Sequence, residues 1–151
     1  MGDVLVLGIG NPLRGDDGVG TAVISTLQHM PLSPNVELVD GGTAGLEIVL
    51  LLQKYQRVVV VDAADMGLLP GEWRRFGGDT AVLTTNTDKL NGTLHNAGFA
   101  EALALAEALD VLPDELVVFG VQPQQVDWVE GLSEEVETAV LPVCQAILAE
   151  F

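Results

Sequence analysis

The sequence predicts a single-domain α/β protein, with a doubly wound, mostly parallel sheet flanked by helices on both faces. Short apolar runs of strand length alternate with segments of helical spacing along the chain. The four consecutive valines in "RVVVVD" at 57–62 are typical of a central parallel strand covered on both faces. The 151 residues, 48% hydrophobic and 19% charged, match one compact domain over 1–151.

Each element is predicted from its own local pattern. Val4 to Ile9 indicates a first buried strand, and apolar residues at helical spacing after Gly18 indicate a helix that prolines 31 and 34 end. Pro142 is expected to kink the last helix or to delay its start. The other predicted elements are a strand at 36–39, a helix at 46–53, the strand at 57–62, a short edge strand or hairpin within 66–76, a helix at 96–109, a strand at 115–121 and a final helix capped by Ser133.

The charge balance restricts the partners of the protein. It carries 22 acidic and 6 basic residues, a formal net charge of −16, and no Lys or Arg follows Lys89. Nucleic acid is therefore not an expected partner, because phosphate binding needs clustered basic side chains. The acidity either keeps the protein in solution by self-repulsion or steers a basic partner such as a positively charged peptide.

The single cysteine and the apolar segments indicate where the protein acts. Cys144 cannot form an internal disulfide or a CxxC metal site, and its place in an apolar pattern predicts a small buried side chain. The N-terminal "MGDVLVLG" lacks the positive region of a signal peptide. Charged residues interrupt the longest apolar stretches well short of a membrane span. We therefore expect a soluble, cytoplasmic protein.

The turn "GNPLRGDDGVG" at 10–20 follows the first strand and carries adjacent carboxylates. Gly8 and Gly10 fit the dinucleotide-binding pattern GxGxxG, but Leu13 occupies the third glycine position. Asp16 and Asp17 at the start of the helix would repel a pyrophosphate. Helix capping explains one of the two aspartates comfortably and the second less well.

A cation would explain the second carboxylate. Ligands of open α/β sheets bind at the carboxyl ends of the strands, near the point where strand order reverses, and Asp62 closes the predicted strand 57–62. If the first and third strands are neighbours, Asp17 and Asp62 converge on one crevice. Two carboxylates about 4 Å apart repel by about 4 kcal/mol at an effective dielectric constant near 20. Such a pair needs a proton or a cation.

A nitrogen donor completes the candidate site. His95 lies in the polar loop "GTLHNAG", where it is either a ligand or an ordinary hydrogen-bonded surface residue, and His29 is the less suitable histidine. Two carboxylates and one imidazole suit Zn, Ni, Mn or Fe and leave coordination positions open. The candidate metal ligands are therefore Asp17, Asp62 and His95.

These motifs together resemble the [NiFe]-hydrogenase maturation endopeptidases. "GIGNPLRGDDGVG", "DGGTAG", "VVVVDAADMG", "LHN" and "GVQP" occur in the order of that family, and the resemblance runs nearly end to end. It implies a small α/β endopeptidase that removes a C-terminal extension from the precursor of the hydrogenase large subunit after nickel insertion. The nickel is then supplied by the substrate, and another divalent metal can occupy the site of the isolated protein.

The resemblance also implies a role for each matching residue. Asp17, Asp62 and His95 correspond to the metal-contacting and catalytic positions, and Asp16 serves the turn or a cap. Asp40, which opens "DGGTAG", resembles a further carboxylate near the cleft of the family. The protein is expected to be a monomer with the large-subunit precursor as its partner.

Two other classes of function use the same crevice. One is a small-molecule or metal-binding module, and the other is a non-catalytic chaperone that holds the loaded precursor without cutting it. The residues leave the cleavage route open among a metal-polarised carbonyl, a metal-bound water and a carboxylate that takes a proton from water. Gln122 and Trp128 can line the cleft, where Gln122 would bond the peptide backbone, or can simply pack.

Overall fold

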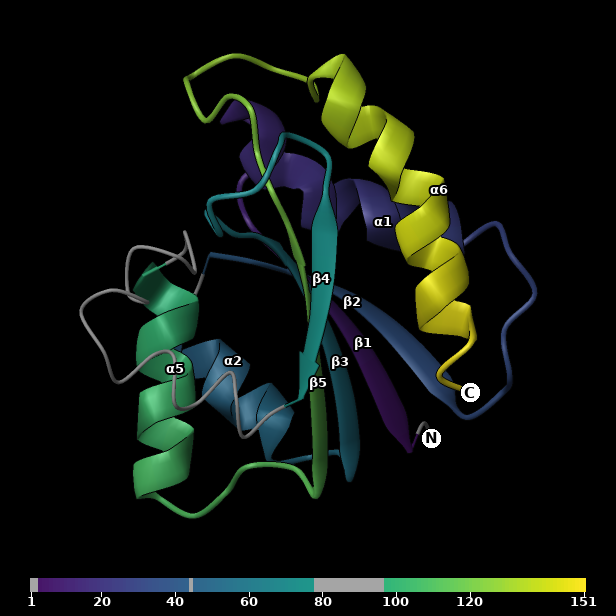
Figure 1. Cartoon of the computed structure of the whole chain (residues 1–151). Coiled ribbons are helices and arrows are strands. Elements are labelled where there is room, and N and C mark those ends of the chain that lie inside the picture. The colour runs from purple at the N-terminus through teal and green to yellow at the C-terminus, as the bar shows by residue number, and fades with distance from the viewer. Residues whose placement is uncertain (1–2, 44, 78–96) are drawn as a thin grey trace.

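The computed structural model describes residues 3–43, 45–77 and 97–151 and has one five-stranded sheet at its centre (Figure 1). The strands are β1 (Val4–Ile9), β2 (Val36–Gly42), β3 (Arg57–Ala63), β4 (Trp73–Gly77) and β5 (Glu115–Val121), in the spatial order β2-β1-β3-β5-β4. Four strands are parallel, and β4 pairs antiparallel with β5 at one edge. This arrangement confirms the predicted mostly parallel sheet.

The order of the strands reverses between β1 and β3. The chain passes from β1 outward to β2 and then returns to β3 on the other side of β1, with Gly8 opposite Asp40 of β2 and Val61 of β3. Because all three strands are parallel, their carboxyl ends lie at the same edge of the sheet. The first and third strands are thus neighbours, which is the condition under which Asp17 and Asp62 were expected to converge. The reversal creates a switch point beside the ends of β1 and β3.

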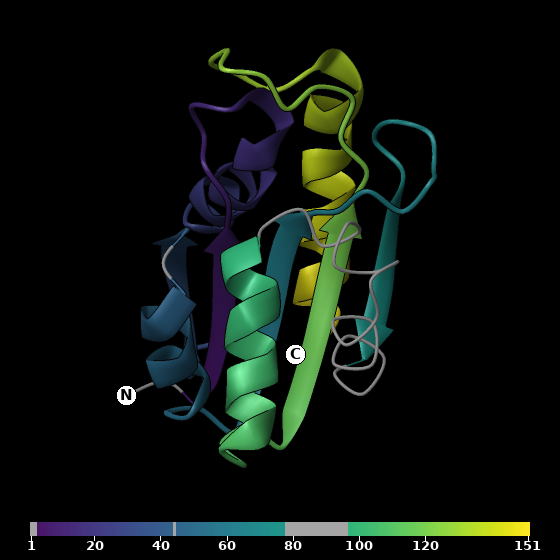
Figure 2. The same cartoon turned by 90° about the vertical axis from the view of Figure 1, so that its left-hand side faces the viewer.

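Helices cover both faces of the sheet, as Figures 1 and 2 show. The helices α1 (Val19–Leu27) and α6 (Glu134–Leu148) pack together on one face, and α2 (Gly45–Leu52) and α5 (Ala97–Ala108) pack together on the other. Successive residues of β3 serve the two cores in turn, with Val58 and Val60 under α2 and α5, and Val59 and Val61 under α1 and α6. This alternation explains the unbroken valine run.

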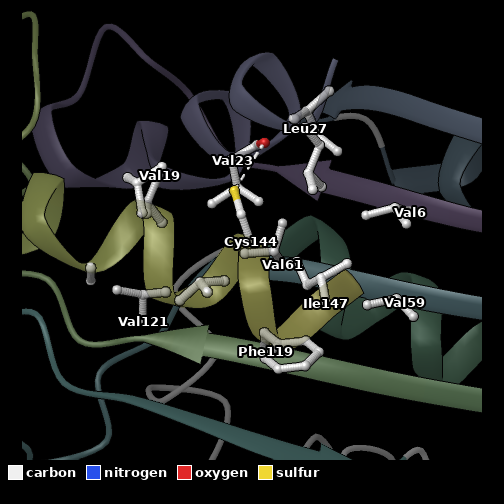
Figure 3. Close-up of a cluster of buried hydrophobic side chains, with 14 of the residues drawn as sticks. Val6, Val19, Val23, Leu27, Val59, Val61, Phe119, Val121, Cys144 and Ile147 are labelled. Atoms are coloured by element: carbon white, nitrogen blue, oxygen red, sulfur yellow. Dashed lines mark hydrogen bonds between the residues drawn. The ribbon is translucent and has the colours of Figure 1, made fainter. Parts of the chain in front are cut away.

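The core between the sheet and the helices α1 and α6 holds the single cysteine (Figure 3). Cys144 is fully buried among Val23, Ile147 and other apolar side chains, and its thiol lies 3.7 Å from the carbonyl oxygen of Val23. Burial raises the pKa of this thiol to about 11. Cys144 is therefore a packed, unreactive side chain, as predicted.

Most element boundaries match the predictions, and two expectations need correction. The strand predicted at 36–39 extends to Gly42, with a register irregularity opposite Gly8 and Ile9. Pro142 does not delay the last helix, because α6 begins at Glu134 and contains Pro142. Ser133 caps that helix as predicted, since its hydroxyl accepts a hydrogen bond from the backbone N–H of Val136.

No helix within the described ranges is both long enough and apolar enough to cross a membrane.

Candidate functional site

Asp62 lies near the carboxyl end of β3, beside the switch point. Strand alternation directs it to the same face as Val60, the face that α2 and α5 cover. Its side chain is fully buried, and neither carboxylate oxygen has a hydrogen-bond partner of good geometry among the described residues. Buried carboxylates normally have such partners, so the burial of Asp62 lowers the stability of the folded protein.

The surroundings of Asp62 favour its uncharged form. Burial raises the pKa of Asp62 well above its ordinary range, and the charge of Asp17 raises it further, while the backbone N–H of Ala63 acts weakly in the opposite direction. Either a proton or a cation can satisfy such a group.

Asp17 reaches the same place from the turn after β1. It lies in the short 3-10 helix η1 (Gly15–Gly18), it is 4% exposed, and its Oδ2 accepts a hydrogen bond of 2.8 Å from the backbone N–H of Asn11. The close packing depends on Gly10, which has φ +130° and whose missing Cβ would stand 1.9 Å from the carbonyl oxygen of Asp17. The position of Asp17 in the turn therefore requires a glycine at residue 10.

The start of α1 also packs closely against the ends of β1 and β3, again at a glycine. A Cβ on Gly20 would lie 2.6 Å from the carbonyl oxygen of Ile9 and 2.9 Å from that of Val61. The glycine allows the acid-bearing turn to sit directly over β1 and β3. This contact brings Asp17 and Asp62 together, as the sequence predicted, close enough for the charge of one to affect the pKa of the other.

Of the two roles expected for Asp16, serving the turn or a cap, the structure shows the first. It is fully buried but caps neither η1 nor α1. Instead, its carboxylate accepts hydrogen bonds from the backbone N–H groups of Gln124, Gln125 and Ser133, at 2.8, 3.0 and 2.7 Å, and from the Ser133 hydroxyl at 2.8 Å. Asp16 therefore fastens the segment before α6 to the acid-bearing turn.

Asp40 stands at the same edge of the sheet but in a different environment. It is exposed near the end of β2, and its Oδ1 accepts hydrogen bonds from the Thr21 hydroxyl at 3.2 Å and from the backbone N–H of Gly42 at 3.4 Å. Because β2 borders β1, Asp40 lies one strand further from Asp62 than the turn does. Its carboxylate is open to solvent.

Gln122 does not offer its amide to a peptide. Its Oε1 accepts hydrogen bonds from the backbone N–H groups of Met66 and Leu68, at 2.7 and 3.2 Å, and its Nε2 donates to Asp65 at 3.2 Å. These bonds hold the connection between β3 and β4. The interpretation of Gln122 as a peptide-binding residue is therefore replaced by an internal, loop-fixing one.

The third predicted ligand is a histidine. His95 lies outside the described residues, and His29 is exposed after the C-terminal end of α1. Within the parts of the chain that the structure describes, no group of three His, Cys, Asp or Glu side chains is arranged to hold a metal ion. The ligand set Asp17, Asp62 and His95 thus stays a prediction.

The fold and this edge define a class of protein: a small doubly wound α/β protein that presents a buried pair of carboxylates at its switch point. The comparisons with known proteins narrow that class. The family model described as hydrogenase maturation protease matches residues 21–150. The chain is 39% identical over 148 residues to the hydrogenase expression/formation protein HupD of Thiocapsa roseopersicina, covering 97% of this chain and 66% of that relative.

Solved structures agree with the sequence relatives. The hydrogenase maturating endopeptidase HybD from E. coli superposes with a TM-score of 0.84 at 29% identity, covering 99% of this chain and 91% of that one. A hydrogenase 2 maturation peptidase from a Thaumarchaeota archaeon gives a TM-score of 0.74 at 34% identity, covering 97% and 96%. The chain belongs to the hydrogenase maturation protease family, a family of peptidases.

Proposed function

We propose that this protein is an endopeptidase that removes the C-terminal extension of a nickel-loaded [NiFe]-hydrogenase large-subunit precursor. One observation carries the proposal: a fully buried Asp62, without a hydrogen-bond partner of good geometry among the described residues, stands beside Asp17 at the switch point. A buried carboxylate pair of this kind is stabilised by a cation. A nickel ion carried by the precursor supplies that charge only when the precursor is loaded.

The proposed roles follow the positions of the side chains. Asp17 and Asp62 hold the nickel of the precursor, and His95 is the third ligand. Support for His95 comes from the chain order, because α5 begins at Ala97, just after it, at the end of the sheet where the parallel strands finish (Figure 1). Asp40, exposed at the same edge, is proposed to meet the substrate.

The same carboxylates serve each route by which water can cleave the peptide bond. A cation held by Asp17 and Asp62 polarises the scissile carbonyl or a water molecule, and a carboxylate that has lost its proton can accept one from the attacking water. In every route the water oxygen bonds to the carbonyl carbon and the amine of the extension leaves with a proton. The enzyme is proposed to be of the aspartic type in this sense.

We extend the proposal to a monomer that acts in the cytoplasm. The support is the single cysteine, Cys144, which is buried and so not available for a disulfide with another chain.

The test is a cleavage assay with two forms of one substrate. The protein is incubated with nickel-loaded and with nickel-free large-subunit precursor, and the products are weighed by intact-mass spectrometry. Truncation of the loaded form only is the expected result. Binding without truncation would instead show a chaperone, and the absence of both would leave a small-molecule or metal-binding module.

Single variants connect the activity to the site. Asp17→Ala, Asp62→Ala and His95→Ala are each expected to abolish processing while the circular dichroism spectrum keeps its α/β shape. Asp114→Ala is the matched control, because Asp114 is exposed at the opposite end of the sheet, just before β5 begins. Unimpaired cleavage by one of the three variants would remove that residue from the proposed ligands.

A further inference from the structure

The segment 124–131, here called the tryptophan loop, is fastened to the turn that carries Asp17. Besides the bonds to Asp16, the backbone N–H of Gly15 donates to the carbonyl oxygen of Val129 at 2.7 Å, and that of Asp16 donates to Gln125 at 2.8 Å. The Arg14 guanidinium donates to the carbonyl oxygen of Val126 at 3.2 Å. Figures 1 and 2 show the loop beside the turn at the end of the sheet where the parallel strands finish.

This fastened loop presents apolar side chains to solvent. Trp128 is 75% exposed, although the Arg14 guanidinium lies over its ring at 5.2 Å from the centroid. Val129, the next residue, is 42% exposed, and Leu13 in the adjoining turn is 57% exposed. An indole that stays this exposed gains little from folding, so burial does not explain why its loop is held so firmly.

A rigid, exposed aromatic side chain is suited to binding. Ordering a loop on association costs free energy, and a loop that hydrogen bonds already hold in place avoids most of that cost. Tryptophan is also enriched among the residues that dominate binding energy. The tryptophan loop therefore has the features of a preorganised contact surface next to the carboxylate pair.

The charge around the loop indicates what it contacts. Asp127 and Glu130 flank the apolar pair and are exposed, and the chain has no Lys or Arg beyond Lys89. Arg14, the basic residue of the adjoining turn, is engaged with Trp128 and with the carbonyl oxygen of Val126. The surface thus combines an apolar centre with an acidic margin, which complements an apolar segment that also carries positive charge.

We propose that Leu13, Trp128 and Val129, together with the acidic margin of Asp127 and Glu130, form the surface on which the precursor polypeptide docks through an apolar segment with a neighbouring basic side chain. Asp16 acts as a positioning residue for this surface, because it holds the loop in register with Asp17. The inference rests on the proposed function and adds a substrate-docking role that is separate from cleavage.

Steady-state cleavage of the nickel-loaded precursor tests the apolar part. Trp128→Ala is expected to raise KM about tenfold and to leave kcat within about twofold, as loss of a binding hot spot predicts. Leu13→Ala should raise KM less. Leu109→Ala is its matched control, because Leu109 is also 57% exposed but follows the C-terminal end of α5, at the other end of the sheet. This control should keep the wild-type KM.

A charge reversal tests the acidic margin. Glu130→Lys is expected to raise KM about three- to tenfold at low salt and by less at high salt, because exposed charges are screened by ions. Asp114→Lys changes the net charge equally at an exposed position before β5. If overall charge alone steers the precursor, both variants will raise KM equally, and the proposed margin would be wrong.

Other outcomes separate this inference from the proposed function. Failure of the wild-type protein to cleave would end the proposed function. Cleavage with an unchanged KM in both Trp128→Ala and Leu13→Ala would overturn the docking surface alone. A self-association of the wild type that Trp128→Ala abolishes, with unchanged kinetics, would assign the surface to a second copy of the chain and would also overturn the proposal.

Discussion

The two ends of the parallel sheet shift the pKa of a carboxyl group in opposite directions. Where the strands begin, Glu150 accepts hydrogen bonds from Arg57 at 2.9 Å and from Arg75 at 2.7 Å. Hydrogen bonding to Arg75 lowers the pKa of Glu150 against an opposing effect of burial, with a further contribution from Arg57. Where the strands finish, burial and Asp17 raise the pKa of Asp62.

The difference shows which carboxylate stabilises the fold and which is available to a ligand. Ion pairs between Glu150 and the two arginines connect the C-terminal end of α6 to β3 and β4. Asp62 has no such cation among the described residues, and Asp16, one residue from Asp17, is satisfied by N–H and O–H donors instead. A buried carboxylate without partners of good geometry is the observation on which the proposed cation site rests.

The largest expected effect comes from neutralising Asp62. Asp62→Asn should lower processing of the nickel-loaded precursor by at least a hundredfold, because a ligand is lost. It should also raise the free energy of unfolding at pH 7, because the amide, unlike a carboxyl group with a raised pKa, takes up no proton on folding. Cleavage assays and urea unfolding measure the two changes. A variant that is both inactive and less stable would point to a structural Asp62.

The next effect separates Asp16 from the neighbouring acids. Asp16→Ala should lower the free energy of unfolding by about 3 to 5 kcal/mol, because buried N–H groups lose their acceptor. Asp40→Ala, at an exposed position, should change it by less than about 0.5 kcal/mol. Urea unfolding of both variants provides the comparison. Equal stabilities would show that the fastening of the tryptophan loop contributes nothing.

The dependence of stability on pH should have opposite signs at the two ends of the sheet. The pKa of Glu150 is lowered on folding, so Glu150→Gln should cost about 1 kcal/mol at pH 7, and this loss should disappear as pH falls through the folded-state pKa, below 4.5. The pKa of Asp62 is raised on folding, so the wild type loses stability as pH rises above about 4, the pKa of an unfolded aspartate. Asp62→Asn has no such loss, and its advantage in stability over the wild type should grow with pH up to the folded-state pKa of Asp62. Unfolding curves from pH 3 to 8 measure both.

The smallest expected effect is that of removing metal from the isolated protein. The core is built from the sheet and its helices, so chelation should change the melting temperature by less than about 2 °C. Differential scanning fluorimetry with and without a chelator measures this change. A large decrease would indicate a structural metal and would contradict a site that receives its cation from the substrate.

Local patterns in the sequence were sufficient to predict most of the fold. The valine run of β3, the apolar spacing of α1 and the Ser133 cap depend on residues close together in the chain, and the structure confirms each. The order of the strands did not follow from these local patterns, and the structure supplies the neighbourhood of the first and third strands. Given that neighbourhood, the convergence of Asp17 and Asp62 follows from their positions after the first strand and at the end of the third.

The missed features depend on contacts between distant segments. Asp16 bonds to Gln124 and Ser133, more than a hundred residues away, and nothing in the turn signals those partners. The Gln122 side chain points inward because its Oε1 accepts hydrogen bonds from the backbone N–H groups of Met66 and Leu68, in the connection after β3. Hydrogen-bond partners of this kind follow from tertiary packing, which periodicity does not encode. The role of His95, outside the described residues, stays a prediction.

The most direct measurement of the central claim is equilibrium dialysis of the metal-free protein against Ni²⁺, and in parallel against Zn²⁺. We expect one ion to bind per wild-type chain, and this binding to be lost in Asp17→Asn and Asp62→Asn but kept in Asp40→Asn. Equal binding by the wild type and by Asp62→Asn would contradict a cation site between the turn and the end of β3.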